Sequence, residues 1–215
     1  ETGIYAYTIN EAEFLHELKG RTAKIIAAAS LYHWNSSAVS ETAALYPEMT
    51  VREIPIELSG REVNAMLEHS YEKCLGQAEH IRNIKDIQKK EAFEVLIHGR
   101  IPVMQSTQCL KKTTGHCNKT SEEIWLEDKK GRKLPVTTHC RECYNLIWQD
   151  KPYNLIGEDL TGSIPYVTRH RFDLFHMSEK EIKEMKDRYL IWQENHFMCD
   201  LQKDDTEHHW NYGIE

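Results

Sequence analysis

Apolar positions recur at helical spacing in several segments of the chain, and three of these segments begin with a capping signal. Ser59 and Glu62 form a capping box, in which a Ser at the N-cap is followed three residues later by a Glu, Ser178 and Glu181 form a second, and an N-cap Asn10 with Glu13 three residues later is a similar start. Apolar residues follow each box with the period of an amphipathic helix. We expect helices over residues 10–19 and 36–45 and from residues 59 and 178 onward, with an exposed helical extension over 77–90.

Short runs rich in apolar and β-branched residues lie between these helices. They span residues 24–30, 50–58, 92–98 and 164–168, the last with Phe175 as an alternative end, and the third run, AFEVLIH, is the clearest strand. Strands that alternate with helices pair in parallel in α/β folds. About four such β/α units predict a single domain over residues 1–215 that is half of a TIM-like (β/α) barrel.

Polar residues follow the predicted strands, and in this architecture function gathers where strands end. Each residue taken singly is more often a capping or loop residue than a ligand, so only their shared location makes them candidates. They are His33–Asn35, Glu57, His98–Arg100 and Arg169–Asp173.

Residues 105–151 break the alternation and carry four cysteines, spaced C-x7-C, then 22 residues, then C-x2-C. We interpret this window as a Cys-rich insertion with a β-hairpin formed by residues 124–126 and 133–136. Four thiolates suit tetrahedral zinc or an iron–sulfur cluster, and spacing does not distinguish the two. The candidate metal ligands are Cys109, Cys117, Cys140 and Cys143, with the flanking His116 and His139 as weaker substitutes.

The charge and hydropathy of the chain limit the classes of partner that it is expected to bind. The net charge of −7 argues against a protein that coats nucleic acid non-specifically. Residues 109–143, however, include eight basic and five acidic residues. This window therefore has a net charge of +3, and the rest of the chain has −10. The window is either a solvated loop or a landing site for a polyanion. No apolar run approaches membrane-spanning length and no secretory signal is visible, so we expect a cytoplasmic protein without membrane contact.

Other chemistry has weaker support. Cys74 and Cys199 lie in helical patterns and are expected to be packing thiols. Three disulfides in a secreted protein are the minority interpretation, weakly favoured by N-x-[ST] sequons at Asn35 and Asn118. Nucleophile-elbow, P-loop, H-E-x-x-H and dinucleotide-binding motifs are all lacking.

The segment from His98 to Met104 followed by Cys109 resembles the "GRxPxM…C" segment of the collagenase-like peptidase family U-32. The resemblance extends over almost the whole chain, through matched positions in the family's order. These are Tyr32, Asn35, Glu57–Ser59, Cys117, Leu126–Asp128, Gly131, Leu134–Val136, Cys140, Cys143–Asn145, Pro152, Arg171–Phe172 and a closing His209…Gly213–Glu215 that resembles the family's last strand.

The resemblance implies an incomplete barrel. The "PAG" turn and "GADAVY" strand of the family's first half-barrel do not occur here, so the chain looks like the C-terminal half of such a protein. The implied partner is the N-terminal half-barrel of the parent protein. An isolated fragment would either fold alone or form a homodimer that covers its exposed strand edges, and the sequence leaves both open.

The resemblance also implies function, in alternative forms. The family takes its name from collagenase-like hydrolases, whereas other members look like enzymes that hydroxylate a tRNA or ribosomal RNA base. In those members cysteines near this segment bind a 4Fe-4S cluster, which here implies Cys109, Cys117, Cys140 and Cys143. Glu57, His98, Arg100 and Arg171 would bind an anionic substrate or cofactor. A peptidase, or a zinc-stabilised binding domain without catalysis, is the alternative to iron–sulfur-dependent RNA hydroxylation.

Overall fold

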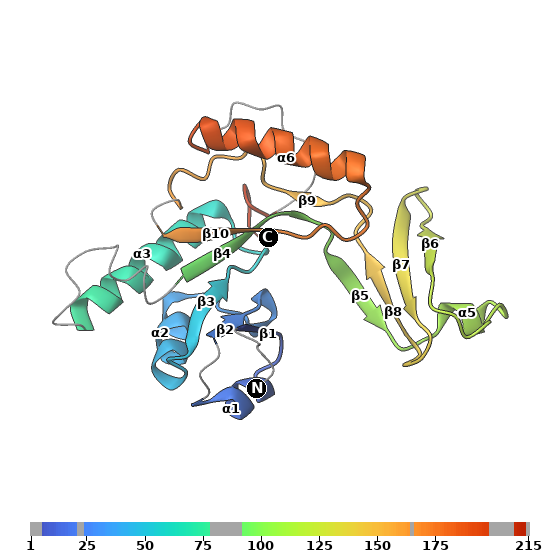
Figure 1. The fold of residues 1–215 in the computed structure, drawn as a ribbon, viewed down its shortest axis with the longest axis horizontal. Coiled ribbons are helices and arrows are strands. Elements are labelled where there is room, and N and C mark those ends of the chain that lie inside the picture. The colour runs from blue at the N-terminus through green and yellow to red at the C-terminus, as the bar shows by residue number, and fades with distance from the viewer. Residues whose placement is uncertain (1–5, 21–23, 78–91, 164–165, 198–208, 214–215) are drawn as a thin grey trace.

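The computed structural model describes residues 6–20, 24–77, 92–163, 166–197 and 209–213, and these residues form two separate sheets (Figure 1). One sheet is largely parallel and is built from alternating β/α units, while the other is antiparallel. In chain order the elements are β1 (Ala6–Ile9), α1 (Glu13–Leu18), β2 (Lys24–Ala27), the 3-10 helix η1 (Ala29–Leu31), α2 (Ser36–Leu45), β3 (Met49–Glu53), α3 (Gly60–Gln77), β4 (Ala92–Gly99), β5 (Pro102–Ser106), α5 (Leu110–Thr113), β6 (Glu123–Glu127), β7 (Lys133–His139), β8 (Tyr144–Trp148), β9 (Tyr153–Asn154), β10 (Val167–Phe172) and α6 (Glu179–Glu194).

The parallel sheet has the strand order β1-β2-β3-β4-β10, so neighbours in the sheet are also neighbours among the parallel strands of the chain. The short strand β9 pairs antiparallel with the last residues of β4. Helices connect β1 to β2, β2 to β3 and β3 to β4, whereas the connection from β4 to β10 contains the antiparallel sheet. Because all five strands are parallel, the carboxyl ends of β1, β2, β3, β4 and β10 lie at one edge of the sheet.

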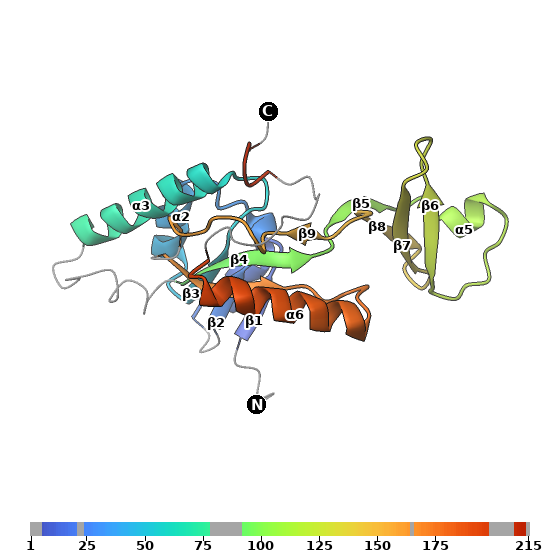
Figure 2. The same ribbon diagram turned by 90° about the horizontal axis from the view of Figure 1, so that it is seen from above.

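The main core lies between one face of this sheet and its helices. Phe93, Val95 and Ile97 alternate along β4 and are buried together with Leu67 of α3 and Trp192 of α6. Helix α6 runs alongside β4 (Figure 2). Burial of this apolar stripe, rather than helix propensity, holds the helices on the sheet.

Both predicted capping boxes are confirmed. The hydroxyl of Ser59 donates to Glu62 Oε2 at 2.7 Å, and the hydroxyl of Ser178 donates to Glu181 Oε2 at 2.6 Å. Helix α2 has the predicted bounds, and Asn35 caps it by accepting a hydrogen bond from Ala38 N at 2.9 Å. These helix starts are local features, and this is why the sequence alone defines them.

Other helices and strands begin or end at residues that differ from those expected from the sequence. The cap expected at Asn10 is wrong, because α1 begins at Glu13 after an N-cap residue whose side chain makes no capping hydrogen bond. The strand expected over 50–58 ends at Glu53, since Pro55 lacks the N–H that a ladder needs. Strand β1 was not predicted. The expected strand 164–168 begins instead at Val167 and continues to Phe172, and residues 164–165 lie outside the described residues.

The carboxyl-terminal segment forms turns over residues 209–213 rather than the expected last strand. It packs on the start of α3, where Gly60 N donates to the carbonyl of Trp210 at 2.7 Å. A Cβ on Gly60 would lie 2.7 Å from the indole of Trp210, so the contact requires glycine. The expected helical extension over 78–90, the side chain of Cys74, and Cys199 lie outside the described part of the chain.

The second sheet is antiparallel, with the order β5-β8-β7-β6, and extends away from the parallel sheet in both views (Figures 1 and 2). The predicted hairpin is confirmed as β6 and β7, which pair from Glu123↔Thr137 to Glu127↔Lys133. Strands β5 and β8 enlarge it to four strands, so the insertion is a sheet in its own right. No helix within the described residues is long and apolar enough to cross a membrane.

Candidate metal and anion sites

All four candidate cysteines lie at one end of the antiparallel sheet. Cys109 follows β5 and Cys117 follows α5, while Cys140 and Cys143 form the turn between β7 and β8. The register pairs Ser106 with Asn145 and His139 with Tyr144, so β5 and β7 end where β8 begins. The connections to the parallel sheet leave from the other end, next to Pro102 and Trp148. Sheet topology thus gathers residues that the sequence separates by more than twenty positions.

The four thiols are free and differ in exposure, since Cys109 and Cys140 are half-buried while Cys117 and Cys143 are exposed. Cys140 Sγ donates to the carbonyl of Thr120 at 3.1 Å, and Cys143 Sγ donates to the carbonyl of Cys140 at 3.6 Å. The disulfide interpretation therefore finds no support at these four positions.

The two cysteine loops have features that suit metal ligation. Cys109 is the N-cap of α5, and its sulfur accepts a hydrogen bond from Lys112 N at 3.4 Å. Cys143 adopts a left-handed backbone with φ +58°, which turns the C-x2-C segment tightly into β8. A soft divalent metal or an iron–sulfur cluster accepts a donor set of four thiols.

The side chains do not close around a common point, however. Among the described residues no three Cys, His, Asp or Glu side chains are arranged so as to hold a metal ion. The donor chemistry and shared location fit a thiolate-bound metal, whereas the side-chain positions do not complete a site. The substitute ligand His139 stacks on Tyr144 with ring centroids 4.3 Å apart, and His116 is exposed.

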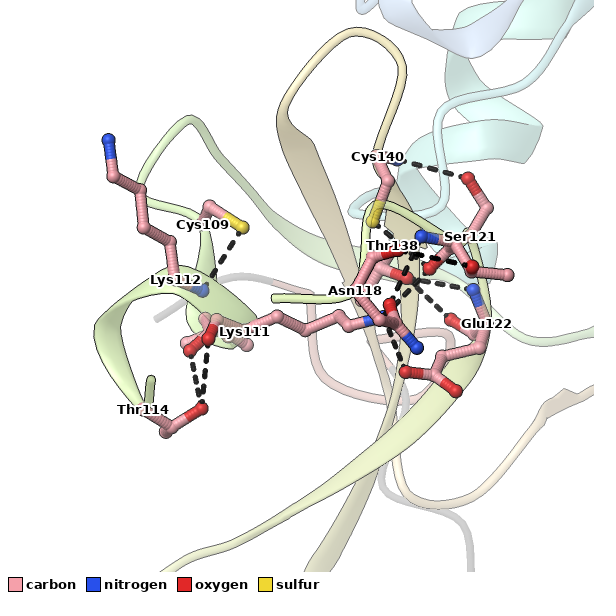
Figure 3. A network of polar contacts seen from close by, with 11 residues as sticks. Cys109, Lys111, Lys112, Thr114, Asn118, Ser121, Glu122, Thr138 and Cys140 are labelled. Carbon is pink, nitrogen blue, oxygen red and sulfur yellow. Dashed lines mark hydrogen bonds and ion pairs between the residues drawn. The ribbon is translucent and has the colours of Figure 1, made fainter. Parts of the chain in front are cut away.

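A buried lysine lies among these loops (Figure 3). Only 5% of the Lys111 side chain is exposed, and its amine donates to Asn118 Oδ1 and to the carbonyl of Thr120 at 2.7 Å. The amine also forms an ion pair with Glu122 at 2.5 Å. The hydrogen bond to Glu122 is the main reason that the pKa of Lys111 is raised, with smaller contributions from the nearby Cys140 and Cys117.

The remaining basic residues of the insertion are exposed, and they divide between the two ends of the sheet. At the cysteine end they are Lys112, Lys119 and Arg141. At the β6–β7 turn they are Lys129, Lys130, Arg132 and Lys133, of which Arg132 is paired with Asp128 at 2.7 Å. Exposed cations therefore lie at both ends of this sheet.

His98 and Arg100, two predicted anion-binding residues, line one pocket of about 190 Å³ between the end of β4 and helix α6. His98 is buried and its Nδ1 lies 3.2 Å from Asn154 Oδ1. Arg100 donates to the carbonyls of Gln149 at 2.9 Å and Asp150 at 2.5 Å. The pocket is of mixed charge, because His176, Glu181, Glu184 and Arg188 also line it.

The other two predicted residues lie elsewhere. Arg171 on β10 reaches across β4 and forms an ion pair with Glu53 on β3, with Nη2 2.6 Å from Oε1. Burial of Glu53 raises the pKa of its carboxyl group, and the charge of Arg171 opposes this effect. Glu57 is half-buried in the loop after β3, close enough to Tyr153 to contribute to the raised pKa of that buried phenol. The structure therefore brings together His98 and Arg100 but not all four residues, and the cysteines lie apart from both groups.

The remaining strand-end candidates have structural contacts. His33 is buried, and burial followed by the charge of Arg52 lowers its pKa to about 4. Asp173 Oδ1 accepts a hydrogen bond from Phe175 N at 3.0 Å and supports the turn toward α6.

Three residues of these regions were missed by sequence reasoning: Glu53, Lys111 and His176. His176 joins the two sheets, since its Nδ1 lies 2.7 Å from Glu123 Oε2 and its ring packs edge-on against Trp148. Glu53 could have been suspected, because it is charged within an apolar run. For Lys111 and His176 no sequence signal distinguishes them from exposed residues.

Comparisons with models of known protein families, with curated proteins and with solved structures returned no match.

Proposed function

We propose that this chain is the C-terminal half-barrel of a U-32-type enzyme that binds an iron–sulfur cluster and hydroxylates a base of tRNA or ribosomal RNA. The parallel sheet supports the half-barrel assignment. Its strands follow one another in sequential order and helices connect the first four of them, as in one half of a (β/α) barrel, while the antiparallel sheet is inserted between β4 and β10. The partner of this chain would be the N-terminal half-barrel of the parent protein. In its absence a second copy of the chain would take its place.

The single observation that carries the proposal is the gathering of Cys109, Cys117, Cys140 and Cys143 at one end of the antiparallel sheet. Four free thiols on two short loops are the donor set that iron–sulfur clusters require. These four residues would hold the cluster after a rearrangement of the two loops that brings their sulfurs together. The bound cluster would supply electron transfer or a Lewis-acidic iron.

RNA as the substrate class is supported by the exposed cations of the same sheet. Basic side chains at both ends of the sheet suit a phosphate backbone that passes along it. The exposed Trp125 of β6 offers a ring on which a single-stranded base stacks. His98 and Arg100 would bind a further anionic group in their pocket.

The experiment is to compare tRNA and ribosomal RNA from cells with and without the gene by mass spectrometry of nucleosides. The proposal predicts that one nucleoside becomes lighter by one oxygen atom in the deletion strain. Reintroduction of the intact gene should restore the mass, and a C109S/C140S gene should not. Identical RNA in all strains, together with cleavage of collagen or casein by the purified protein, would replace RNA hydroxylation by the peptidase alternative.

A zinc-stabilised binding domain is the second candidate. It is favoured by the C-x2-C turn with its left-handed Cys143, because such tight turns grip one ion in structural zinc sites. In this case the insertion would bind RNA without chemistry. A colourless protein with one zinc ion per chain and unchanged RNA in the deletion strain would favour it.

A further inference from the structure

The two cysteine loops are connected through one short segment, residues 118–122. Cys109 and Cys117 flank α5 on one side of this segment, and Cys140 and Cys143 form the β7–β8 turn on the other. A metal site that uses all four thiols therefore depends on the contacts by which residues 118–122 hold the two cysteine loops in place. The described contacts show two sets of ties, one on each side of the segment.

The first set comes from Lys111. An ammonium group has three N–H donors, and here it meets three oxygen acceptors in residues 118–122, namely Asn118 Oδ1, the carbonyl of Thr120 and Glu122 Oε1. The side chain is 5% exposed, although the loop residues around it are exposed themselves. A lysine covered in this way is retained only if its charge and its donors are satisfied.

The second set runs from the same segment to the β7–β8 turn. Ser121 Oγ accepts a hydrogen bond from Cys140 N at 3.0 Å, and the carbonyl of Thr120 accepts one from Cys140 Sγ at 3.1 Å. Thr138, just before this turn, forms three hydrogen bonds with Glu122. Thr138 N and Thr138 Oγ1 donate to the carbonyl of Glu122 at 3.0 and 2.8 Å, and Thr138 Oγ1 accepts from Glu122 N at 2.9 Å. The carbonyl of Thr120 thus accepts hydrogen bonds from both Lys111 and Cys140.

We propose that Lys111 is a positioning residue whose buried ammonium group ties the Cys109/Cys117 loop to the Cys140/Cys143 turn before any metal binds. In the metal-free chain the two cysteine loops are then ordered around the buried ammonium group of Lys111. The four thiols lie at the same end of the sheet but do not converge on one point. This inference rests on the proposed thiolate site and adds how that site is preorganised. Without the ammonium group only the second set of hydrogen bonds would hold residues 118–122, so metal binding would include the entropy cost of ordering the Cys109/Cys117 loop.

The test uses the full chain after removal of metal by a chelator. Hydrogen exchange of residues 105–122 and 138–145 is compared in wild type, Lys111→Met, Lys111→Arg and Lys112→Met. Lys112 is the matched control, because it is the next residue of α5 and its side chain is exposed. We expect at least 10-fold faster exchange of both segments in Lys111→Met, partial rescue in Lys111→Arg and no change in Lys112→Met. Exchange of β4 reports whether the rest of the fold is intact.

Titration of the same proteins with Co²⁺ gives the second measurement, since thiolate ligation produces an intense absorption band in the near ultraviolet. The band should reach half its intensity at a Co²⁺ concentration at least 10-fold higher in Lys111→Met than in wild type. Should Lys111→Met fail to fold, Asn118→Leu removes one acceptor and should change both measurements in the same direction by less.

The outcomes separate the two proposals. Wild type without any Co²⁺ band would contradict the thiolate site, while exchange of the metal-free chain would still decide the role of Lys111. Equal exchange and equal Co²⁺ titration of wild type and Lys111→Met would overturn the role of Lys111 and leave the thiolate site standing.

Discussion

The guanidinium group of Arg171 lies 2.6 Å from the carboxylate of Glu53, and the two residues belong to strands that are separated by β4. The register explains the contact. Glu53 pairs with Glu94 on β4, and Arg171 pairs with Leu96, two residues further along β4, so both side chains project from the same face. Glu53 is 3% exposed and also accepts a hydrogen bond from Ala29 N at 3.0 Å. The pair therefore joins β3, β10 and the loop after β2.

Replacing Arg171 by Met should leave a buried carboxylate without its cation. We expect a loss of about 3 kcal/mol in the free energy of unfolding, because removal of the half-exposed guanidinium group leaves the charge of the buried Glu53 carboxylate uncompensated. Urea denaturation measures it. Arg169→Met on the same strand, where the side chain is exposed, should change stability little. A double variant, E53L/R171M, should be less unstable than Arg171→Met alone, and equal losses in the Arg171 and Arg169 variants would contradict this role.

His33 should make the fold sensitive to acid. Its pKa in the folded state is about 4 against an ordinary value of 6.5, so the unfolded state binds the proton more readily. The stability contribution of neutral His33 is complete above about pH 6.5 and is lost as the pH falls toward 4. At about 1.36 kcal/mol per pKa unit the loss amounts to roughly 3 kcal/mol.

Urea denaturation between pH 7 and pH 4 checks this prediction. The His33→Gln variant should lose stability less steeply over this range than the wild type, although it starts from a lower value. His69→Gln is the matched control, since His69 is exposed on α3. A His33→Gln profile parallel to that of the wild type would show that His33 titrates normally in the folded chain.

The contact between Trp210 and Gly60 predicts that the stability losses caused by mutating the two residues are not additive. Trp210→Ala removes a buried indole, which is 6% exposed, and should cost about 3 kcal/mol. Gly60→Ala should cost about 2 kcal/mol, because its Cβ would lie 2.7 Å from the indole. The double variant should lose clearly less than the sum, since alanine at position 60 has no indole to meet. Additive losses in urea denaturation would show that the two residues act independently.

The junction between the sheets predicts a selective loss of order. His176 is 8% exposed in its side chain and lies 2.7 Å from Glu123, so His176→Ala should loosen the antiparallel sheet from the parallel one. Hydrogen exchange of Thr137 and Trp148 should accelerate, with β3 and β4 unchanged. Glu123→Gln should have a smaller effect in the same direction. Glu127→Gln, an exposed position on the same strand, should have none, and equal exchange in all variants would contradict the junction.

Local signals predicted much of this fold, and pairing between distant residues accounts for what they missed. The capping boxes at Ser59 and Ser178 define two helices because each lies within one turn of chain. Strand β1 escaped prediction, since its four residues are mostly exposed or half-buried and carry little periodicity. Strand β5 was missed because its only partner, β8, lies far from it along the chain, and β8 was missed because the short turn that joins it to β7 was interpreted as a metal-binding C-x2-C segment.

The candidate site was predictable in its residue types and not in its geometry. Cysteine spacing indicated a thiolate site, but their shared end follows from the β5-β8-β7-β6 order, which spacing does not reveal. Lys111 lies in a basic run and was expected at the surface, whereas three oxygens of residues 118–122 draw it inward. Likewise, Arg171 was expected to bind a substrate, yet its partner is Glu53, a residue brought near only by the parallel sheet.

Metal and sulfide analysis of the full chain purified without oxygen tests the central proposal most directly. The account predicts a brown protein with about four iron and four sulfide ions per chain and a broad absorption near 400 nm, roughly where thiolate–iron charge transfer occurs. C109S/C140S should lose the colour and most of the iron, while Ser106→Ala, at the same end of the sheet, should keep both. Wild-type protein that holds neither iron nor sulfide after anaerobic reconstitution would contradict the account.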